Sequence, residues 1–331
     1  MAEMTQRQRP LLPSKLSWLI VAILMFNAVL FVSQRFKWFS FNVHKGWTVL
    51  IALTCTGIFL GLFALWLTAV LLLRWEFRVS IRSLLTLFVV GAIPLGWLAA
   101  EMKAARRQMD AINWIGIEHG GYAYDWQCDA QGQPLWPMPN ARKPPALPWL
   151  SNLLGDDLFA DVVSVKFADG YPPIAPGDLE HLEWLTRVKR LSFVGNMIAD
   201  AGLEHIRLMK ELEYLTLADN GITDDGLKSL EGLVDLRMLD ISDERISGPG
   251  LQHLGGMMKL RGLRLCDMPI ASAGVGYLSG LTQLEVLNLG QTQITDADLE
   301  HISGLINLRS LALSSSFALF SVVCTLSWPP A

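Results

Sequence analysis

The feature that most constrains this chain is a spacing of 24 residues that recurs through its second half without a slip. The first column holds Leu191, Leu215, Leu239, Leu263, Leu287 and Leu311; the second holds Phe193, Leu217, Ile241, Leu265, Leu289 and Leu313; the third holds Val188, Leu212, Leu236, Leu260, Leu284 and Leu308. A partial copy, with Phe167, Ile174, Leu179 and Leu182, precedes them. Such self-similarity predicts stacked structural units rather than one closed core.

Within one unit the apolar pattern changes its period. In LEYLTLADNGITDDGL, residues 212–227, the first half alternates apolar and polar residues like a strand. The second half spaces its apolar residues like a short helix that follows a turn. One unit is too small to be stable alone, so each strand is expected to pair in parallel with the next and to cover its open core. The sequence predicts an α/β solenoid with a parallel sheet on its concave face.

The repeating unit LxxLxxLxLxxNxITDxGLxxL resembles the leucine-rich repeat, and the resemblance covers residues 160–313. Its TDxGL ending is similar to a subclass found in bacterial membrane-anchored repeat proteins and in the adaptor arms of eukaryotic ubiquitin ligases. No F-box-like helical segment precedes the repeats, which speaks against the second group. The column usually held by Asn reads Asn196, Asn220, Glu244, Met268, Thr292 and Ser316. A ladder of side chains bonded to the turns is therefore expected to be incomplete after the second repeat.

Helix starts are expected to be capped within each repeat. Ser, Thr or Asp follows the Ile of each turn, at Asp200, Thr223–Asp224, Ser247, Ser272 and Thr295–Asp296. These residue types accept hydrogen bonds from the first amides of a helix.

The first hundred residues predict a membrane anchor. The chain is 51% hydrophobic. Three stretches without Lys, Arg, Asp or Glu, 16–33, 46–73 and 83–100, meet the criterion of roughly 20 residues for spanning a bilayer. The sequence predicts an all-α transmembrane region of three helices after an N-terminal tail at 1–15. The first stretch also fits a secretory signal, but no small-x-small cleavage site follows it, which favours an uncleaved helix.

Charge divides the chain into two parts. Residues 1–100 carry nine Lys/Arg and two Glu, whereas residues 101–331 carry 18 Lys/Arg and 29 Asp/Glu. An acidic surface repels phosphate backbones, so no nucleic-acid partner is expected. Lys/Arg counts on the two sides of the membrane tie. The density of Arg74, Arg78 and Arg82 places the second loop inside and the repeat domain outside, in an extracytoplasmic position.

The regions that flank the repeats have distinct patterns. Residues 101–160 predict a juxtamembrane helix ending at Gly120–Gly121, a strand at Tyr122–Trp126, a Pro-rich linker at 134–148 and an N-terminal cap for repeats at 161–316. The uncharged tail 317–331 has three readings: a cover for the last repeat, a fourth membrane segment, or an aberrant terminus from a truncated or shifted reading frame. We favour the aberrant terminus.

Signals for catalysis and metal binding are weak. His181, His205, His253 and His301 share one column, which favours a structural role over metal binding. The acidic cluster Asp156, Asp157 and Asp161 fits a paired-acid site, but a solvated cap is favoured. The glycine motif at 274–280 lacks the context of a phosphate loop. No GxSxG, HExxH, Walker A or SxxK string occurs, and the four cysteines predict neither zinc nor a disulfide framework. We therefore expect no enzyme, cofactor or metal.

The residues that alternate with the buried leucines predict a binding face. The candidates are Arg190, Ser192, Tyr214, Thr216, Met238, Asp240, Arg264 and Asn288. Their mixture of aromatic, Met and Arg side chains is typical of interface centres. The favoured function is a membrane-anchored, non-enzymatic repeat protein that binds a protein partner through this face. The alternatives are a ligand-binding receptor or sensor, a substrate-recognition arm of a ubiquitin-ligase-like system, and an enzyme with its site in 101–160.

Overall fold

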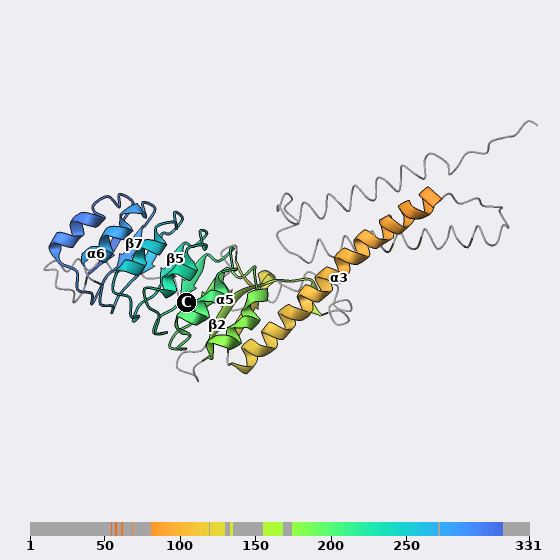
Figure 1. Ribbon diagram of the computed structural model, residues 1–331, viewed down its shortest axis with the longest axis horizontal. Coiled ribbons are helices and arrows are strands. Elements are labelled where there is room, and N and C mark those ends of the chain that lie inside the picture. Colours follow the sequence, from red (N-terminus) through yellow and green to blue (C-terminus); the bar gives the residue numbers. More distant parts are fainter. Residues whose placement is uncertain are drawn as a thin grey trace, which may run out of the picture. The chain divides into compact units, whose positions relative to one another are not determined.

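The computed structural model describes residues 81–118, 120–129, 133–134, 155–167, 174–270 and 272–313, together with four isolated helical positions between 54 and 68 (Figure 1). The chain divides into two compact units. One contains residues 1–106 and 143–160, and the other contains residues 107–142 and 161–331. The second unit holds the repeats.

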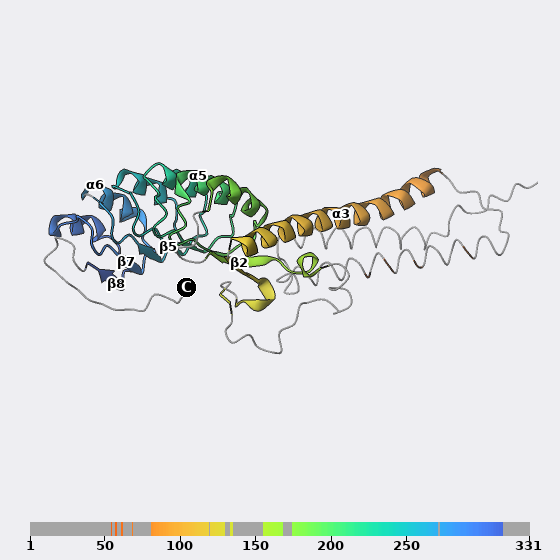
Figure 2. The same ribbon diagram turned by 90° about the horizontal axis from the view of Figure 1, so that it is seen from below.

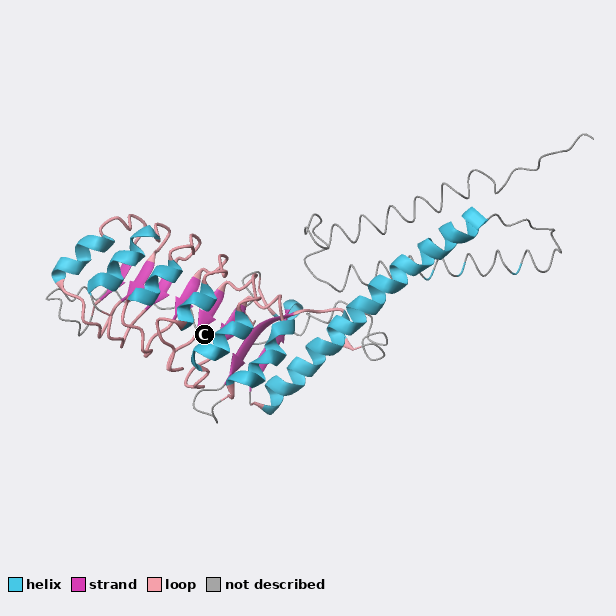
Figure 3. Ribbon diagram, in the orientation of Figure 1, coloured by secondary structure: helices cyan, strands magenta, loops and turns pink. Residues whose placement is uncertain are grey.

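One eight-stranded sheet runs through the repeat unit, and its strand order follows the sequence (Figure 3). The strands are β1 (Gly120–Tyr124), β2 (Val162–Phe167), β3 (Arg190–Ser192), β4 (Tyr214–Thr216), β5 (Met238–Asp240), β6 (Gly262–Arg264), β7 (Val286–Asn288) and β8 (Ser310–Ala312). β1 pairs with β2 antiparallel, and every later pair is parallel. From β3 to β8 each residue pairs with the residue 24 positions later, which confirms the predicted solenoid.

A short helical element follows most strands and lies on the opposite side of the coil, so that the strands line the inner side of the arch (Figure 2). The α-helices are α5 (Ala199–Ile206) and α6 (Ser272–Val275); the 3₁₀ helices are η4 (Pro176–Trp184), η5 (Gly226–Leu230), η6 (Pro249–Leu254), η7 (Gly276–Gly280) and η8 (Asp296–Ile302). Two further 3₁₀ turns, η2 (Asp125–Gln127) and η3 (Asp156–Leu158), precede β2. Because a 3₁₀ helix rises about 2.0 Å per residue, a few residues suffice to cross the coil.

The leucine columns form one continuous core. Leu215, Leu239 and Leu263 are at most 2% exposed, and all belong to a single buried cluster. The partial repeat packs on the first full repeat, because the rings of Phe167 and Phe193 stack with centroids 4.8 Å apart. The stacking of neighbouring coils, rather than any one unit, therefore buries the apolar side chains.

The N-terminal end of this core is covered by the end of a long helix, α3 (Ile81–Ile117). Its residues Ala111, Ile112, Trp114 and Ile115 belong to the same buried cluster as the leucines. Trp114 lies 5.5 Å from the ring of Phe167. The last turns of α3, together with β1, thus form the cap of the solenoid. The predicted strand at Tyr122–Trp126 begins two residues earlier, at Gly120.

Several helix starts are bonded across coils, so the prediction of capping within each repeat is wrong for them. The Asp200 carboxylate accepts from the Thr223 amide at 2.8 Å and from its hydroxyl at 2.6 Å. Asp224 accepts from the Ser247 hydroxyl at 2.6 Å and from the Gly250 amide at 2.7 Å. Partial burial favours a raised pKa for Asp224, but these hydrogen bonds outweigh it, and the pKa is lowered. These aspartates therefore join one coil to the next.

At Thr295 the bonds are local, as predicted. The Asp298 carboxylate accepts from the Thr295 amide at 2.7 Å and from its hydroxyl at 2.9 Å. Asp298 stands in the column that holds glycine in the four preceding repeats, at Gly202, Gly226, Gly250 and Gly274. In the last described repeat, the hydrogen bonds at the start of the helical turn therefore stay within one coil.

The predicted membrane segments receive no support from the structure. Segment 16–33 and most of segment 46–73 lie outside the described residues, as do the tails 1–15 and 317–331 and most of the Pro-rich linker. The backbone of 83–100 is helical and continues without a break into the predicted juxtamembrane helix. Among the residues that the structure describes, no helix combines the length and the apolar character that a membrane span requires.

Candidate protein-binding face

The structure gathers all eight predicted binding residues on one face of the sheet. One row runs through Arg190, Tyr214, Met238, Gly262, Val286 and Ser310; the other runs through Ser192, Thr216, Asp240, Arg264, Asn288 and Ala312. Because strand side chains alternate, these rows point away from the buried leucines. Seven of the eight candidates are partly exposed, and Asp240 is buried. Their role in binding stays a prediction.

Arg190 and Tyr214 form one unit on the first row. The Arg190 guanidinium carbon lies 4.1 Å from the centroid of the Tyr214 ring, the geometry of a cation–π contact. Burial lowers the pKa of Arg190, although Tyr214 and Asp129 favour its charged form. The stacked pair presents a flat, partly apolar and cationic surface next to Met238. Such a surface fits a protein interface better than an isolated charge does.

The segment 125–129 borders the N-terminal end of this face, because Asp129 and Cys128 interact electrostatically with Arg190. Cys128 is buried with Ala123 and Val163 in a small cluster of its own. Burial, together with Asp129 and Asp125, raises the pKa of the Cys128 thiol to about 12. The thiol is therefore protonated at neutral pH and is a poor nucleophile.

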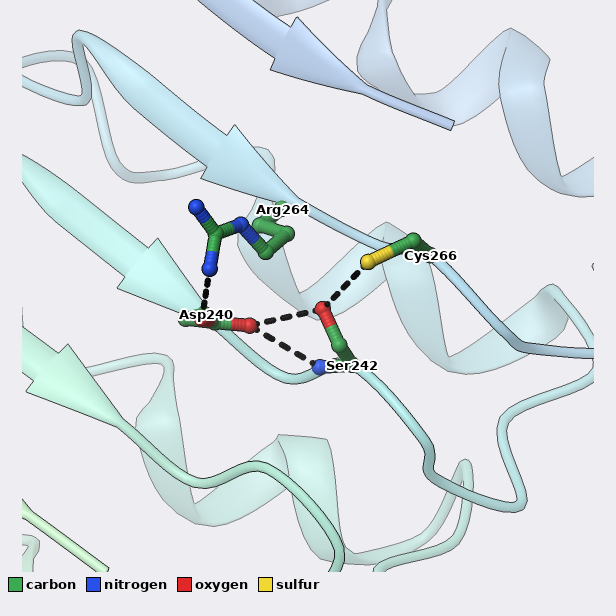
Figure 4. Close-up of polar contacts among 4 residues, drawn as sticks. All are labelled: Asp240, Ser242, Arg264 and Cys266. Carbon is green, nitrogen blue, oxygen red and sulfur yellow. Dashed lines mark hydrogen bonds and ion pairs between the residues drawn. The ribbon is translucent and has the colours of Figure 1, made fainter. Parts of the chain in front are cut away.

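Asp240 holds the second row in place (Figure 4). One carboxylate oxygen lies 3.1 Å from Arg264 Nη1. The other accepts from the Ser242 amide at 3.2 Å and from its hydroxyl at 2.7 Å, and Cys266 Sγ lies 3.1 Å from that hydroxyl oxygen. Since Asp240 is 4% exposed, it cannot be the exposed contact residue that its column suggested. It positions Arg264, whose guanidinium can reach a partner.

Beside the face, the turns are joined by the ladder in the Asn column, and the ladder extends further than predicted. Asn220 Oδ1 accepts from the Asn196 amide at 3.2 Å, and its Nδ2 donates to the Leu217 carbonyl at 2.6 Å. In the third repeat, Glu244 replaces the amide. Its Oε1 accepts from the Asn220 amide at 2.8 Å and its Oε2 from the Ile222 amide at 2.6 Å. A carboxylate with two acceptor atoms thus continues the connection between coils.

The buried position of Glu244 changes the pH range in which its carboxyl group titrates. It is 3% exposed, and burial raises its pKa to about 7, against the opposing effect of the backbone hydrogen bonds from Asn220, Ile222 and Gly221. The folded protein therefore binds a proton at a pH where the unfolded chain has released it. This contribution to stability is fully present below about pH 4.5 and is lost as the pH rises through about 7.

Replacing Glu244 by glutamine should remove this pH dependence. The free energy of unfolding of the wild type, measured relative to Glu244→Gln, should fall by roughly 3 kcal/mol between pH 4 and pH 8, at about 1.4 kcal/mol per pKa unit. Urea unfolding of both proteins across this range checks the expectation. Parallel stability profiles would show that Glu244 keeps an ordinary pKa in the fold.

Three of the four histidines in the helical column contact neighbouring groups. His205 Nδ1 lies 2.8 Å from Glu183, His253 is bonded to Glu231, and His181 stacks on Trp114 with centroids 5.4 Å apart. In the described ranges no cluster of His, Cys, Asp or Glu could hold a metal ion. The contacts of His205 and His253 therefore join neighbouring helical turns.

The acidic cluster before β2 differs from its prediction as a solvated cap. Asp157 is 5% exposed and Asp161 is 9% exposed. The Asp161 carboxylate lies 3.2 Å from Arg187 Nη1, and its backbone carbonyl accepts from the Asp125 amide at 2.9 Å. Asp161 therefore fastens the start of β2 to the first full repeat and to the segment after β1.

Three comparisons with known proteins were made: with family models, with curated proteins and with solved structures. No protein-family model matches the chain, and no curated protein matches it. Internalin C2 from Listeria monocytogenes is one of 191 matching chains of solved structures. The matched sequences are 27% identical, the match covers 41% of this chain and 55% of internalin C2, and the TM-score is 0.37. The chain thus spans about half the length of that protein. The leucine columns and the sheet register of residues 162–313 form a solenoid like that of leucine-rich repeat proteins.

Proposed function

We propose that the chain is a membrane-anchored, non-enzymatic leucine-rich repeat protein that binds a protein partner through the concave face of its sheet. The observation that carries the proposal is the pair of rows on that face, where Tyr214, Met238 and Arg264 stand partly exposed beside one another in adjacent coils. Solenoids of this kind use their concave surface for binding. The three uncharged apolar stretches of the first hundred residues support the anchor.

Two features of the face favour a protein over a small ligand. Its partly exposed side chains are spread over six coils, at roughly 4.8 Å per strand, so a partner can contact many of them at once. Its charged groups are already paired or stacked, since Arg264 is held by Asp240 and Arg190 lies on Tyr214. Preorganised aromatic and Arg side chains are typical of the residues that dominate binding energy in protein interfaces.

A matched pair of tyrosines tests the face in the full chain. Tyr214 lies on the concave rows, and Tyr277 is exposed on η7, on the helical side. A photo-reactive phenylalanine analogue at position 214 should crosslink a protein partner recovered with the membrane fraction, whereas the same analogue at 277 should not. Tyr214→Ala combined with Met238→Ala should weaken recovery of that partner by about tenfold, as expected for two central interface residues.

The corresponding control is Tyr277→Ala, which should leave recovery unchanged. Asp240 is not a suitable position for this test, because its loss would leave Arg264 and Ser242 without their buried partner and would disturb the fold. Crosslinking at 277 that equals or exceeds crosslinking at 214 would rule out the concave face. Release of the chain from membranes by alkaline carbonate would rule out the anchor.

A further inference from the structure

We propose that a second surface, the strand-start edge of the sheet, binds an acidic segment of a protein partner. We define the strand-start edge as the row of residues that directly precede β3 to β8: Lys189, Glu213, Arg237, Arg261, Glu285 and Arg309. This row borders the concave face but is separate from its two rows. The proposal does not depend on a partner at the concave face.

The edge consists of two triads in which one acid is shared by two cations. Glu213 lies 4.0 Å from Lys189 and 3.0 Å from Arg237. Glu285 lies 3.5 Å from Arg261 and 3.7 Å from Arg309. Each triad therefore carries one surplus positive charge. Because β5 pairs with β6, Arg237 and Arg261 stand in adjacent coils, each bonded to a glutamate on its far side.

The three arginines of the edge are its outermost groups, whereas the side chain of Lys189 is 27% exposed. The side chains of Arg237, Arg261 and Arg309 are 43%, 60% and 75% exposed, whereas those of Glu213 and Glu285 are 17% and 29% exposed. A partner thus meets guanidinium groups before it meets carboxylates. The edge contrasts with the rest of the domain, since residues 161–313 together carry 13 Lys/Arg and 22 Asp/Glu. Charge complementarity selects an acidic partner at this place.

Exposed apolar side chains accompany the cations. Val234, Met258 and Ile306 each stand three residues before a cation of the edge, in equivalent loops, and are 50%, 60% and 85% exposed. In the intervening coil the same position holds Thr282. Exposed aliphatic groups at equivalent positions of three coils provide apolar surface that a partner can cover. The segment that fits carries acidic residues toward Arg237 and Arg261 and apolar residues toward Met258 and its neighbours.

The test uses the full chain in detergent micelles and a fluorescein-labelled peptide of twelve residues, three copies of Glu-Leu-Glu-Ser. Anisotropy should show binding that weakens as the salt concentration rises, because the charges are exposed. The double variant Arg237→Glu with Arg261→Glu should weaken binding by about tenfold or more. Met258→Ser with Ile306→Ser should weaken it by roughly threefold, in proportion to the apolar contact that is lost.

The matched control reverses two exposed cations outside the edge, Lys228→Glu with Arg245→Glu. It should bind the peptide within about twofold of the wild type, and Tyr214→Ala should do the same. Thermal unfolding of each variant shows that the domain is intact. Absence of peptide binding to the wild type, or equal loss in the control and edge variants, would overturn the proposal. Displacement by short-chain phosphatidylglycerol at lower concentrations than by unlabelled peptide would assign the edge to lipid headgroups and would also overturn it.

Discussion

Substitution of Glu244 by alanine should lower the free energy of unfolding of the repeat domain by about 4 kcal/mol. The two carboxyl oxygens of Glu244 accept the amides of Asn220 and Ile222 in the preceding coil, and both of these residues are buried. Alanine leaves these two donors without acceptors, at a cost of roughly 1–3 kcal/mol each, and it opens a cavity. The effect should exceed that of any surface glutamate, because it breaks the connection between two coils.

Urea unfolding of the full chain, followed by circular dichroism at pH 6, measures this loss. The control is Glu300→Ala, since Glu300 is an exposed residue of η8. It should change the free energy of unfolding by less than about 0.5 kcal/mol. If the two alanine variants were equally stable, the ladder would not contribute as the hydrogen bonds indicate.

Replacing Gly250 by alanine should cost about 3 kcal/mol, although alanine is the better helix former. A Cβ at this position would lie 2.6 Å from Asp224 Cα and 2.7 Å from the Asp224 carbonyl oxygen. Both are backbone atoms of the preceding coil, so no side-chain rotation relieves the overlap. The coils would have to separate, which would also lengthen the hydrogen bond from the Gly250 amide to the Asp224 carboxylate.

The matched control is Gly256→Ala, six residues further along the same coil, where an added Cβ meets nothing within 4 Å. It should leave the unfolding midpoint unchanged or raise it slightly, because alanine restricts the unfolded chain. Thermal unfolding of the two variants compares the positions directly. Equal midpoints would mean that the coils can separate at no cost, contrary to the close contact at Gly250.

The sequence predicted the parts of the fold that follow from periodicity. Because side chains alternate along a strand and the repeat has constant length, the columns of Leu191 and Phe193 fix both the register of the sheet and the side that faces the core. The same argument placed Tyr214, Met238 and Arg264 on one face. Periodicity is a property of residue spacing, so it needs no knowledge of contacts.

Contacts between coils were not predictable from spacing alone. Asp224 was expected to cap its own helix, but its side chain reaches the next coil, because the close approach at Gly250 brings that turn within hydrogen-bond distance. Glu244 appeared to interrupt the Asn ladder, yet its longer side chain reaches the same amides. Residue spacing did not reveal the strand-start edge, because the charge of its residues changes sign from coil to coil. The residues of this edge share a position before a strand, not a residue type.

The central claim is that neighbouring coils supply one another's interior, and hydrogen exchange in the full chain tests it most directly. In Glu244→Ala, amide protection should fall in the mutated coil and also in both neighbours, at Leu217 before it and at Leu265 after it, since these amides bond to carbonyls of the following coils. The loss should diminish toward β8. Loss of protection confined to residues 238–246, with both neighbouring coils unchanged, would contradict the account.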